Sequence, residues 1–347
     1  MISSRHFRAS VLCCVGNYSE GWDRIVPPPF LIFANHSIFV NMLSKVLVAE
    51  KLMNGHLHLT GSLTLPELKD IARRHRINLR PFEPIEQEGT FHDSIMWAVA
   101  KEVTSQPAGL LSAILKVLEN EKTNGVAYIE LTLNPFGMVR RGLKPKYIAS
   151  ILEESVRFAE SRNIFLRFKL GVNRKDDPSS VMIVREVYLL SKCGVCSHID
   201  LNGDERRYPI QPFITSFASL TREGIPVSLH VGEYNTHKPT LDEILVCKPS
   251  RIAHALHFDR SDYAVLAEQK IAIEVSLISN RVTGALGSTR THPVREMADC
   301  GIQVIIGTDD PAFFGKSTIT DELVELSRHG FSTEEILDIN RSACLSN

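Results

Sequence analysis

Residues 226–254 read PVSLHVGEYNTHKPTLDEILVCKPSRIAH and contain two short apolar runs that each carry a histidine near the end. The run Pro226–Val231 has the length and composition of a buried strand, and Arg251–Ala255 repeats the pattern one unit later. The longer stretch between the two runs is predicted to be helical. A strand, a helix and a second strand in this order are typical of an α/β fold with a parallel sheet.

The same alternation extends outward from this stretch in both directions. Eight strands separated by helices imply a parallel sheet, and the count predicts closure into a (β/α)8 TIM barrel. A chain of 347 residues suits one such barrel with insertions. The six further predicted strands are Val46–Leu57, Tyr128–Leu133, Phe165–Leu170, His198–Asn202, Ile271–Ser276 and Gln303–Thr308.

One connection is unusually long, because Leu59–Ala127 separates the first two predicted strands. We expect a helical insertion that leaves the carboxyl-terminal face of the barrel and covers it as a lid. The pair Thr64 and Glu67 has the spacing of a capping box that opens a helix, as does the pair Ser332 and Glu335. Residues 1–46 are predicted to be an N-terminal extension of unclear role, and residues 47–347 the barrel domain.

Composition and charge exclude several classes of function. With 39 basic and 40 acidic residues the formal charge is −1 and no basic stripe occurs, so a nucleic-acid polymer is not an expected partner. No apolar run reaches the length of a membrane span. The seven cysteines form an odd, scattered set, which favours a reducing compartment and hence a cytoplasmic location. The sequence does not indicate an oligomeric state.

Polar side chains that can bind a metal follow four of the predicted strands. His56 and His58 point to the same face of the first strand, because side chains alternate along a strand. His230, His254 and Asp309 end later strands, at the edge where barrel active sites are built. A lone histidine is more often a core residue, and Asp309-Asp310-Pro311 is also typical of a helix start. Taken together, however, imidazoles and a carboxylate at one edge fit a zinc ion with a water molecule.

Six ordered motifs resemble those of the adenosine deaminase family and run from about Gly55 to the carboxyl end. They are His56-Leu57-His58-Leu59-Thr60-Gly61, Asp200-Leu201-Asn202-Gly203-Asp204-Glu205, His230-Val231-Gly232-Glu233, Arg251-Ile252-Ala253-His254, Ser276-Leu277-Ile278-Ser279-Asn280 and Thr308-Asp309-Asp310-Pro311. The resemblance implies one zinc ion per chain, and it implies roles for the matched residues. The implied ligands are His56, His58, His230 and Asp309.

The resemblance also implies how a substrate is handled. Glu233 would be the proton shuttle, and His254 would orient the attacking hydroxide. Asp310 and Gly203 would bind the purine ring, with His58 and Thr60 beside the substrate. Thr60 departs from the family, which carries an aspartate there that contacts the sugar hydroxyl.

The expected reaction is zinc-dependent hydrolytic deamination of adenosine or a related 6-aminopurine, a small molecule, to the 6-oxopurine and ammonia. Adenine, N6-modified AMP and aminodeoxyfutalosine are alternative substrates, since the neutral Thr60 would not repel a phosphate. Lys238 and Arg281 are candidate phosphate contacts, although solvated charges are the more ordinary interpretation. An amidohydrolase of a different substrate and a silent binding protein are the remaining hypotheses. Neither explains why the purine-facing and catalytic positions are all filled.

Overall fold

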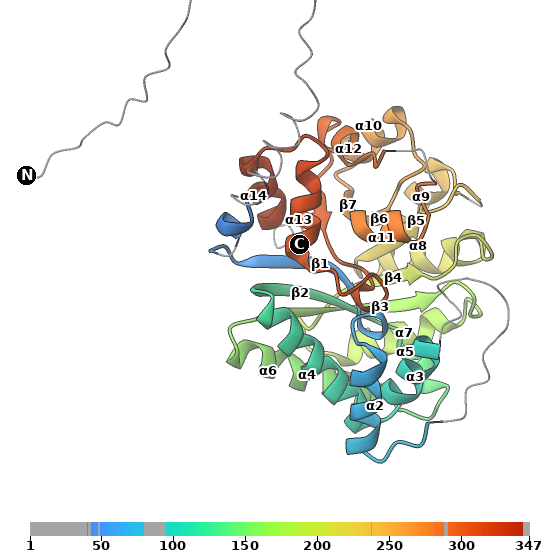
Figure 1. Ribbon diagram of the computed structural model, residues 1–347. Coiled ribbons are helices and arrows are strands. Elements are labelled where there is room, and N and C mark those ends of the chain that lie inside the picture. Colours follow the sequence, from blue (N-terminus) through green and yellow to red (C-terminus); the bar gives the residue numbers. More distant parts are fainter. Residues whose placement is uncertain are drawn as a thin grey trace, which may run out of the picture. The chain divides into compact units, whose positions relative to one another are not determined.

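The chain forms a barrel of eight parallel strands in the part that the structure, a computed structural model, describes (Figure 1): residue 40 and residues 43–47, 49–79, 95–236, 238–287 and 291–342. The strands are hydrogen-bonded in sequence order, β1 next to β2 and so on to β8, and all neighbouring pairs are parallel. The predicted TIM barrel is confirmed. The strands are β1 Leu52–His58, β2 Val126–Leu133, β3 Phe165–Asn173, β4 Cys196–Asn202, β5 Val227–Val231, β6 Arg251–His254, β7 Ala272–Val275 and β8 Val304–Ile306.

The barrel closes between β1 and the segment that follows β8. The N–H of Asp309 donates to the carbonyl of His56 at 2.9 Å, and the N–H of His58 donates to the carbonyl of Asp309 at 2.9 Å. Asn54 joins the same two segments through its side chain, which donates to the Thr308 hydroxyl at 2.8 Å. The closure therefore brings the two ends of the domain together at the predicted metal ligands.

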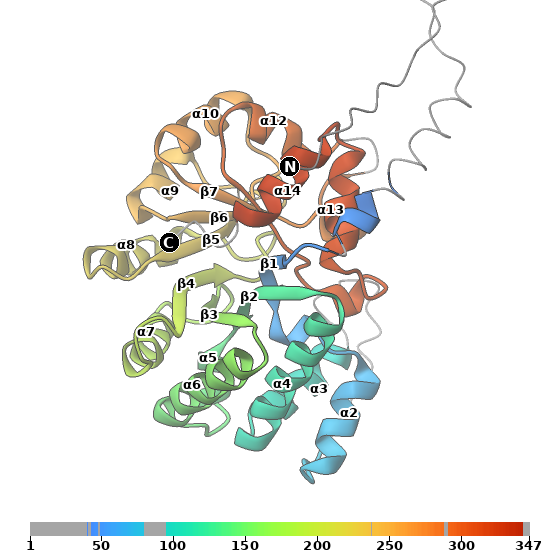
Figure 2. The same cartoon turned by 90° about the vertical axis from the view of Figure 1, so that its left-hand side faces the viewer.

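Helices surround the strands on the outside, as both views show (Figures 1 and 2). Their apolar faces pack on the sheet, and residues such as Ile148, Phe217 and Leu323 are fully buried. The helices that follow β2 and the later strands are α5 Pro135–Val139, α6 Pro145–Ser161, α7 Ser180–Leu190, α8 Ile214–Arg222, α9 Leu241–Cys247, α10 Arg260–Glu268, α11 Leu277–Val282, α12 Val294–Asp299, α13 Ile319–Ser327 and α14 Thr333–Ser342.

The predicted insertion after the first strand is helical. It contains α2 Leu65–Arg74, α3 Ile95–Thr104 and α4 Pro107–Thr123, which lie together on one side of the barrel in Figure 2. The predicted capping box opens α2, because the Glu67 carboxylate accepts hydrogen bonds from the Thr64 N–H at 2.8 Å and hydroxyl at 2.7 Å. The second predicted box opens α14, where Ser332 and Glu335 bond reciprocally.

The predicted start of the first strand is wrong. Residues 43–47 are helical, and β1 begins only at Leu52. Leu43 and Leu47 are fully buried and four residues apart, while Val46 is 40% exposed, so the local pattern has helical rather than strand periodicity. Apart from residue 40 and residues 43–46, the predicted extension 1–46 lies outside the described residues.

None of the helices in the described ranges is long and apolar enough to cross a membrane.

Candidate active site

The carboxyl ends of the strands open into a cavity of about 720 Å³. Side chains from helix α3 of the insertion and from the segments after β2, β3 and β4 also line it. His56 lies just below the floor and is 1% exposed. The remaining predicted site residues all line this one cavity: His58, Thr60, Gly203, His230, Glu233, His254, Asp309 and Asp310.

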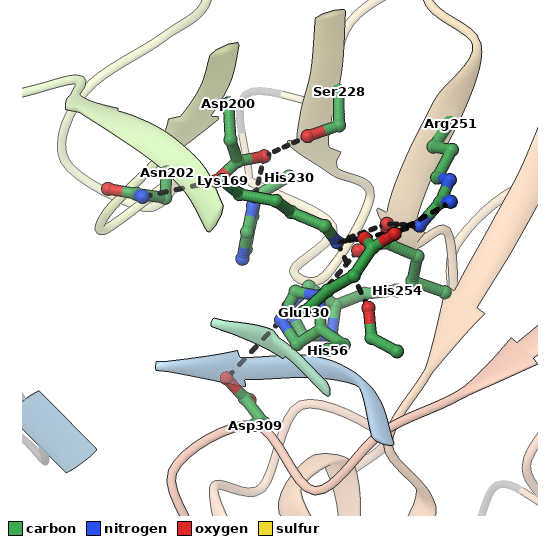
Figure 3. A network of polar contacts seen from close by, with 12 residues as sticks. His56, Glu130, Lys169, Asp200, Asn202, Ser228, His230, Arg251, His254 and Asp309 are labelled. Carbon is green, nitrogen blue, oxygen red and sulfur yellow. Dashed lines mark hydrogen bonds and ion pairs between the residues drawn. The ribbon is translucent and has the colours of Figure 1, made fainter. Parts of the chain in front are cut away.

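Imidazole nitrogens and one carboxylate oxygen face each other at the cavity floor (Figure 3). The Nε2 atoms of His58 and His230 are 3.2 Å apart. Asp309 Oδ1 lies 3.4 Å from Nε2 of His58 and 3.5 Å from Nε2 of His56. His56 Nε2 is buried and has no hydrogen-bond partner among the described residues. Because a buried polar atom normally has a partner, this nitrogen fits a metal ligand.

Two overlapping groups of side chains bring their ligand atoms within 4.8 Å of one another. One consists of His56, His58 and Asp309, and the other of His56, His230 and His254. The four predicted ligands are divided between them, and His254 is a geometric competitor to which the family resemblance gave a different role. Distances alone do not choose between these groups.

Three of the four predicted ligands are held by a partner behind them, as is usual for metal-binding side chains. His56 Nδ1 is 2.5 Å from a carboxylate oxygen of Glu274 on β7. His230 Nδ1 lies 3.2 Å from Asp200 on β4. The Ser279 hydroxyl on α11 donates to Asp309 Oδ2 at 2.6 Å, which leaves Oδ1 facing the histidines.

Beneath this floor the barrel interior is filled by buried charges (Figure 3). Arg251 on β6 bonds both oxygens of Glu130 on β2, at 2.6 and 3.1 Å. Lys169 on β3 bonds Glu274 and donates to the Gly55 carbonyl at 3.2 Å. All four charged side chains are at most 1% exposed. Because two cations face two anions, the layer compensates its own charge and fixes the carboxylate that holds His56.

The acids of the cavity have opposite electrostatic surroundings. Burial, followed by the charges of Asp309 and Glu205, raises the pKa of Glu233 to about 8. Burial and the charge of Asp309 raise the pKa of Asp310 well above its ordinary value. Burial acts the same way on Asp309, but the neighbouring histidines outweigh it and hold its pKa well below the ordinary range. The site therefore combines one ionised carboxylate with two acids that keep their protons.

His254 ends β6 in an unusual backbone conformation, with φ of +71°. Left-handed backbone is costly for a residue with a side chain, on the order of 1 kcal/mol, and is often found at functional sites. Its Nε2 lies 4.0 Å from Glu233 Oε2. Burial, which outweighs the nearby charge of Asp309, lowers the pKa of His254 well below its ordinary value, so the ring is neutral.

The absence of a side chain at Gly61 makes room for the carboxyl group of Asp310. A Cβ at Gly61 would lie 1.7 Å from the Oδ1 atom of Asp310, so any side chain there would displace this carboxyl. Asp310 Oδ1 is buried and has no hydrogen-bond partner within the described part of the chain. The interpretation of this segment as a helix start is confirmed, because Asp310 is the N-cap residue of the short 3-10 helix Pro311–Phe313, but its side chain makes no capping bond there.

Comparison with known proteins agrees with this geometry. The family model described as adenosine deaminase matches residues 52–346. The chain belongs to the adenosine deaminase family. As a family member it is a hydrolase that acts on the C–N bond of a cyclic amidine, and a hydrolytic purine deaminase.

Two curated members of the family are similar over most of their length. An aminodeoxyfutalosine deaminase of Acidothermus cellulolyticus is 27% identical over 84% of this chain and 86% of its own. An adenosine deaminase of Clostridium botulinum is 28% identical over 81% of this chain and 88% of its own. Among solved structures, an amidohydrolase from Burkholderia ambifaria with bound Zn has a TM-score of 0.73 at 18% identity, covering 88% of this chain and 87% of its own. That likeness shows the fold.

The residues behind the ligands were missed from the sequence. Lys169 and Glu274 lie inside strands that were predicted correctly, and a charged residue in the middle of a buried strand was the available signal. Asp200, Ser279 and Asn280 stand in the quoted adenosine deaminase motifs, yet the sequence assigned them no role. Their contacts join segments that are far apart along the chain, so spacing alone could not pair them.

Proposed function

We propose that the chain is a zinc-dependent deaminase that converts adenosine or a related 6-aminopurine to the 6-oxopurine and ammonia, with one zinc ion per chain. One observation carries the proposal. The Nε2 atoms of His58 and His230 are 3.2 Å apart, and the Oδ1 atom of Asp309 lies 3.4 Å from His58 Nε2. All three side chains line the cavity that Glu233 also lines. Neutral nitrogens with a carboxylate oxygen are a ligand set that zinc prefers.

In this proposal His56, His58, His230 and Asp309 hold the metal. The buried His56 Nε2, which has no hydrogen-bond partner among the described residues, and the low pKa of Asp309 support these assignments. When bound, zinc lowers the pKa of a water molecule from 15.7 to about 7 and so supplies a nucleophile near neutral pH. Glu274, Asp200 and Ser279 would orient three of the four ligands.

The other side chains would handle the purine. Glu233, with a pKa of about 8, holds a proton at neutral pH that it can donate to the ring nitrogen beside the attacked carbon. The same carboxyl can later help ammonia to leave. His254 would hydrogen-bond the attacking oxygen. Asp310, also protonated, would donate to a nitrogen of the five-membered ring, and Gly203 would approach the ring closely because it has no side chain.

The outer cavity supports an anionic group on the substrate as a second candidate. The cations Arg140, Arg141 and Lys175 line it, and the neutral Thr60 lies where the family carries an aspartate. The earlier phosphate candidates lie elsewhere: Lys238 donates to the His257 carbonyl at 2.9 Å, and Arg281 pairs with Glu325. N6-modified AMP, a nucleotide, fits this rim better than free adenine does.

We also propose a cytoplasmic location, which the free thiols of Cys193, Cys196, Cys247 and Cys300 in the described part of the chain support. The proposed partner is the small-molecule purine. Neither a nucleic acid nor a membrane is proposed.

Release of the amine tests the reaction directly, as ammonia from adenosine, adenine and aminodeoxyfutalosine and as methylamine from N6-methyl-AMP. Purified protein loaded with zinc is incubated with adenosine, adenine, N6-methyl-AMP and aminodeoxyfutalosine, and zinc is counted by elemental analysis. We expect one zinc per chain and turnover of at least one of these purines. A preference for N6-methyl-AMP that weakens in Lys175→Ala favours the anionic candidate. Failure of metal-replete protein to deaminate any member of the panel would overturn the proposal.

A further inference from the structure

A line of hydrogen bonds runs behind His254, from the backbone of α12 to the floor of the cavity. The N–H of Val294 donates to His292 Nδ1 at 3.1 Å. His292 Nε2 lies 3.2 Å from Asn280 Oδ1, and Asn280 Nδ2 lies 3.0 Å from His254 Nδ1. The three side chains are at most 5% exposed, so bulk water does not compete for these contacts.

The first donor in this line decides where every following proton sits. A backbone N–H can only donate, so His292 Nδ1 must accept and its remaining proton must be on Nε2. That proton requires the carbonyl oxygen of Asn280 opposite it, which fixes the orientation of the amide. The NH2 group of Asn280 then faces His254 Nδ1. Since NH2 is a donor, this nitrogen must carry a lone pair, and the proton of a neutral His254 is on Nε2.

We propose that His292 and Asn280 are positioning residues that hold His254 as the tautomer with its proton on Nε2. His254 then presents a hydrogen-bond donor to the cavity and is not a metal ligand. The tautomer follows from the line of contacts alone. The donor function toward a reacting oxygen rests on the proposed deaminase function.

The inference resolves the competition between the two possible ligand groups. The group His56, His230 and His254 would need a lone pair on His254 Nε2, which the line of contacts places on Nδ1 instead. The group with His58 and Asp309 makes no such demand. A protonated Nε2 also cannot accept a proton from water, so Glu233, 4.0 Å away, becomes the group beside it that carries protons.

The backbone supports the same arrangement from both ends. Asn280 lies on α11, where its own N–H donates to the Ser276 carbonyl at 3.0 Å. His254 is turned toward Asn280 by its left-handed backbone conformation, which its neighbour Ala255 shares with φ of +51°. The main chain therefore helps to position both partners.

Long-range proton–nitrogen NMR of protein labelled with ¹⁵N-histidine tests the tautomer, with and without one equivalent of zinc. We expect the Nδ1 signal of His254 to have the shift of an unprotonated nitrogen in both samples. In Asn280→Asp, a carboxylate replaces the amide donor without changing its size, so Nδ1 should become protonated. A wild-type His254 that carries its proton on Nδ1, or that binds zinc through Nε2, would overturn the inference.

Variants of His292 test the line without altering Asn280. In His292→Phe the amide is no longer held, so we expect both tautomers of His254 and a fall in kcat of about 10- to 100-fold with KM little changed. His292→Gln keeps an N–H donor and should restore the wild-type tautomer. His329→Phe is the matched control, because its ring lies 6.0 Å from that of His292 but outside the line.

The tautomer and the activity are read separately. If His292→Phe keeps the wild-type tautomer, the positioning role is wrong, whatever its activity. If no 6-aminopurine is turned over, the proposed function fails while the NMR result still decides the inference.

Discussion

Glu233 shows how burial lets an ordinary carboxyl keep its proton at neutral pH. Its ordinary pKa would leave it ionised at neutral pH, and Asp309 and Glu205 nearby add negative charge that opposes ionisation. Asp309 is surrounded by imidazoles and takes the opposite state. The difference between the two carboxylates lies in what surrounds them, since the side-chain chemistry is the same.

Replacing Glu233 with glutamine should leave substrate binding nearly intact and lower kcat by about 10²- to 10⁴-fold, because the amide cannot donate and recover a proton. In the wild type, kcat/KM should fall above about pH 8, where Glu233 loses its proton. Steady-state rates between pH 5 and 10 measure both effects. A wild-type rate that keeps rising through pH 9 would contradict this role. Glu296→Gln, a change of a half-buried carboxylate that does not line the cavity, serves as the control.

Helix α11 carries two of the side chains that hold the site, yet it is only six residues long. Its N-cap residue Ser276 makes no side-chain capping bond. Instead, the buried Glu322 of α13 accepts the N–H groups of Leu277 at 2.7 Å and Ile278 at 3.2 Å. A neighbouring helix thus fixes the short one, and with it Ser279 and Asn280.

Glu322→Ala should therefore weaken metal binding without touching a ligand. Two buried N–H groups would lose their acceptor, at a cost of about 1–3 kcal/mol each, and α11 would shift away from Asp309. We expect zinc affinity to fall about 10- to 100-fold, as for other residues behind metal ligands. Titration with a competing chelator measures this. Glu322→Gln retains an acceptor oxygen and should lose much less, and equal losses in both variants would argue against the capping role.

The seam between β1 and β8 couples the stability of the barrel to pH. Asn54 bridges it and also donates to Glu121 of α4 at 3.0 Å. Burial raises the pKa of Glu121 to about 7, although the bond from Asn54 lowers it somewhat. A carboxyl with a raised pKa in the folded state contributes its full stability below the unfolded value of about 4.5. That contribution is lost as pH rises through about 7.

Glu121→Gln should remove this dependence while keeping the hydrogen bond. Between pH 4.5 and 8 the wild type should lose about 3 kcal/mol of unfolding free energy relative to the variant. Urea unfolding at pH 5 and pH 8.5 gives the difference. Glu119→Gln, an exposed change on the same helix, should behave as wild type. If the free energies of unfolding of the wild type and Glu121→Gln changed equally between these two pH values, Glu121 would not be the source of the pH dependence.

The proposed metal should stabilise the whole barrel, because its ligands come from β1, β5 and the segment after β8. Removing a metal ion that binds only the folded state lowers the free energy of unfolding by about 4 kcal/mol if the free metal concentration was 1,000 times Kd. Dialysis against a chelator should therefore lower Tm by several degrees, and zinc should restore it. Asp309→Ala should show no such shift, and a chelator-insensitive wild type would contradict the ligand assignment.

The sequence by itself determined the barrel, its helical insertion and the candidate residues, because alternating strands and helices and side chains at strand ends are local patterns. It misplaced the start of β1, because apolar residues such as Val46 and Leu47 occur both in strands and on the buried faces of helices. Only the burial of Leu43 and Leu47, four residues apart, reveals a helix. The tertiary structure decided the rest: which carboxyls keep protons, that Lys169 and Arg251 neutralise Glu130 and Glu274, and that His292 reaches His254 through Asn280. These depend on distances between segments far apart in the chain and on exclusion of water, and neither is written in local spacing.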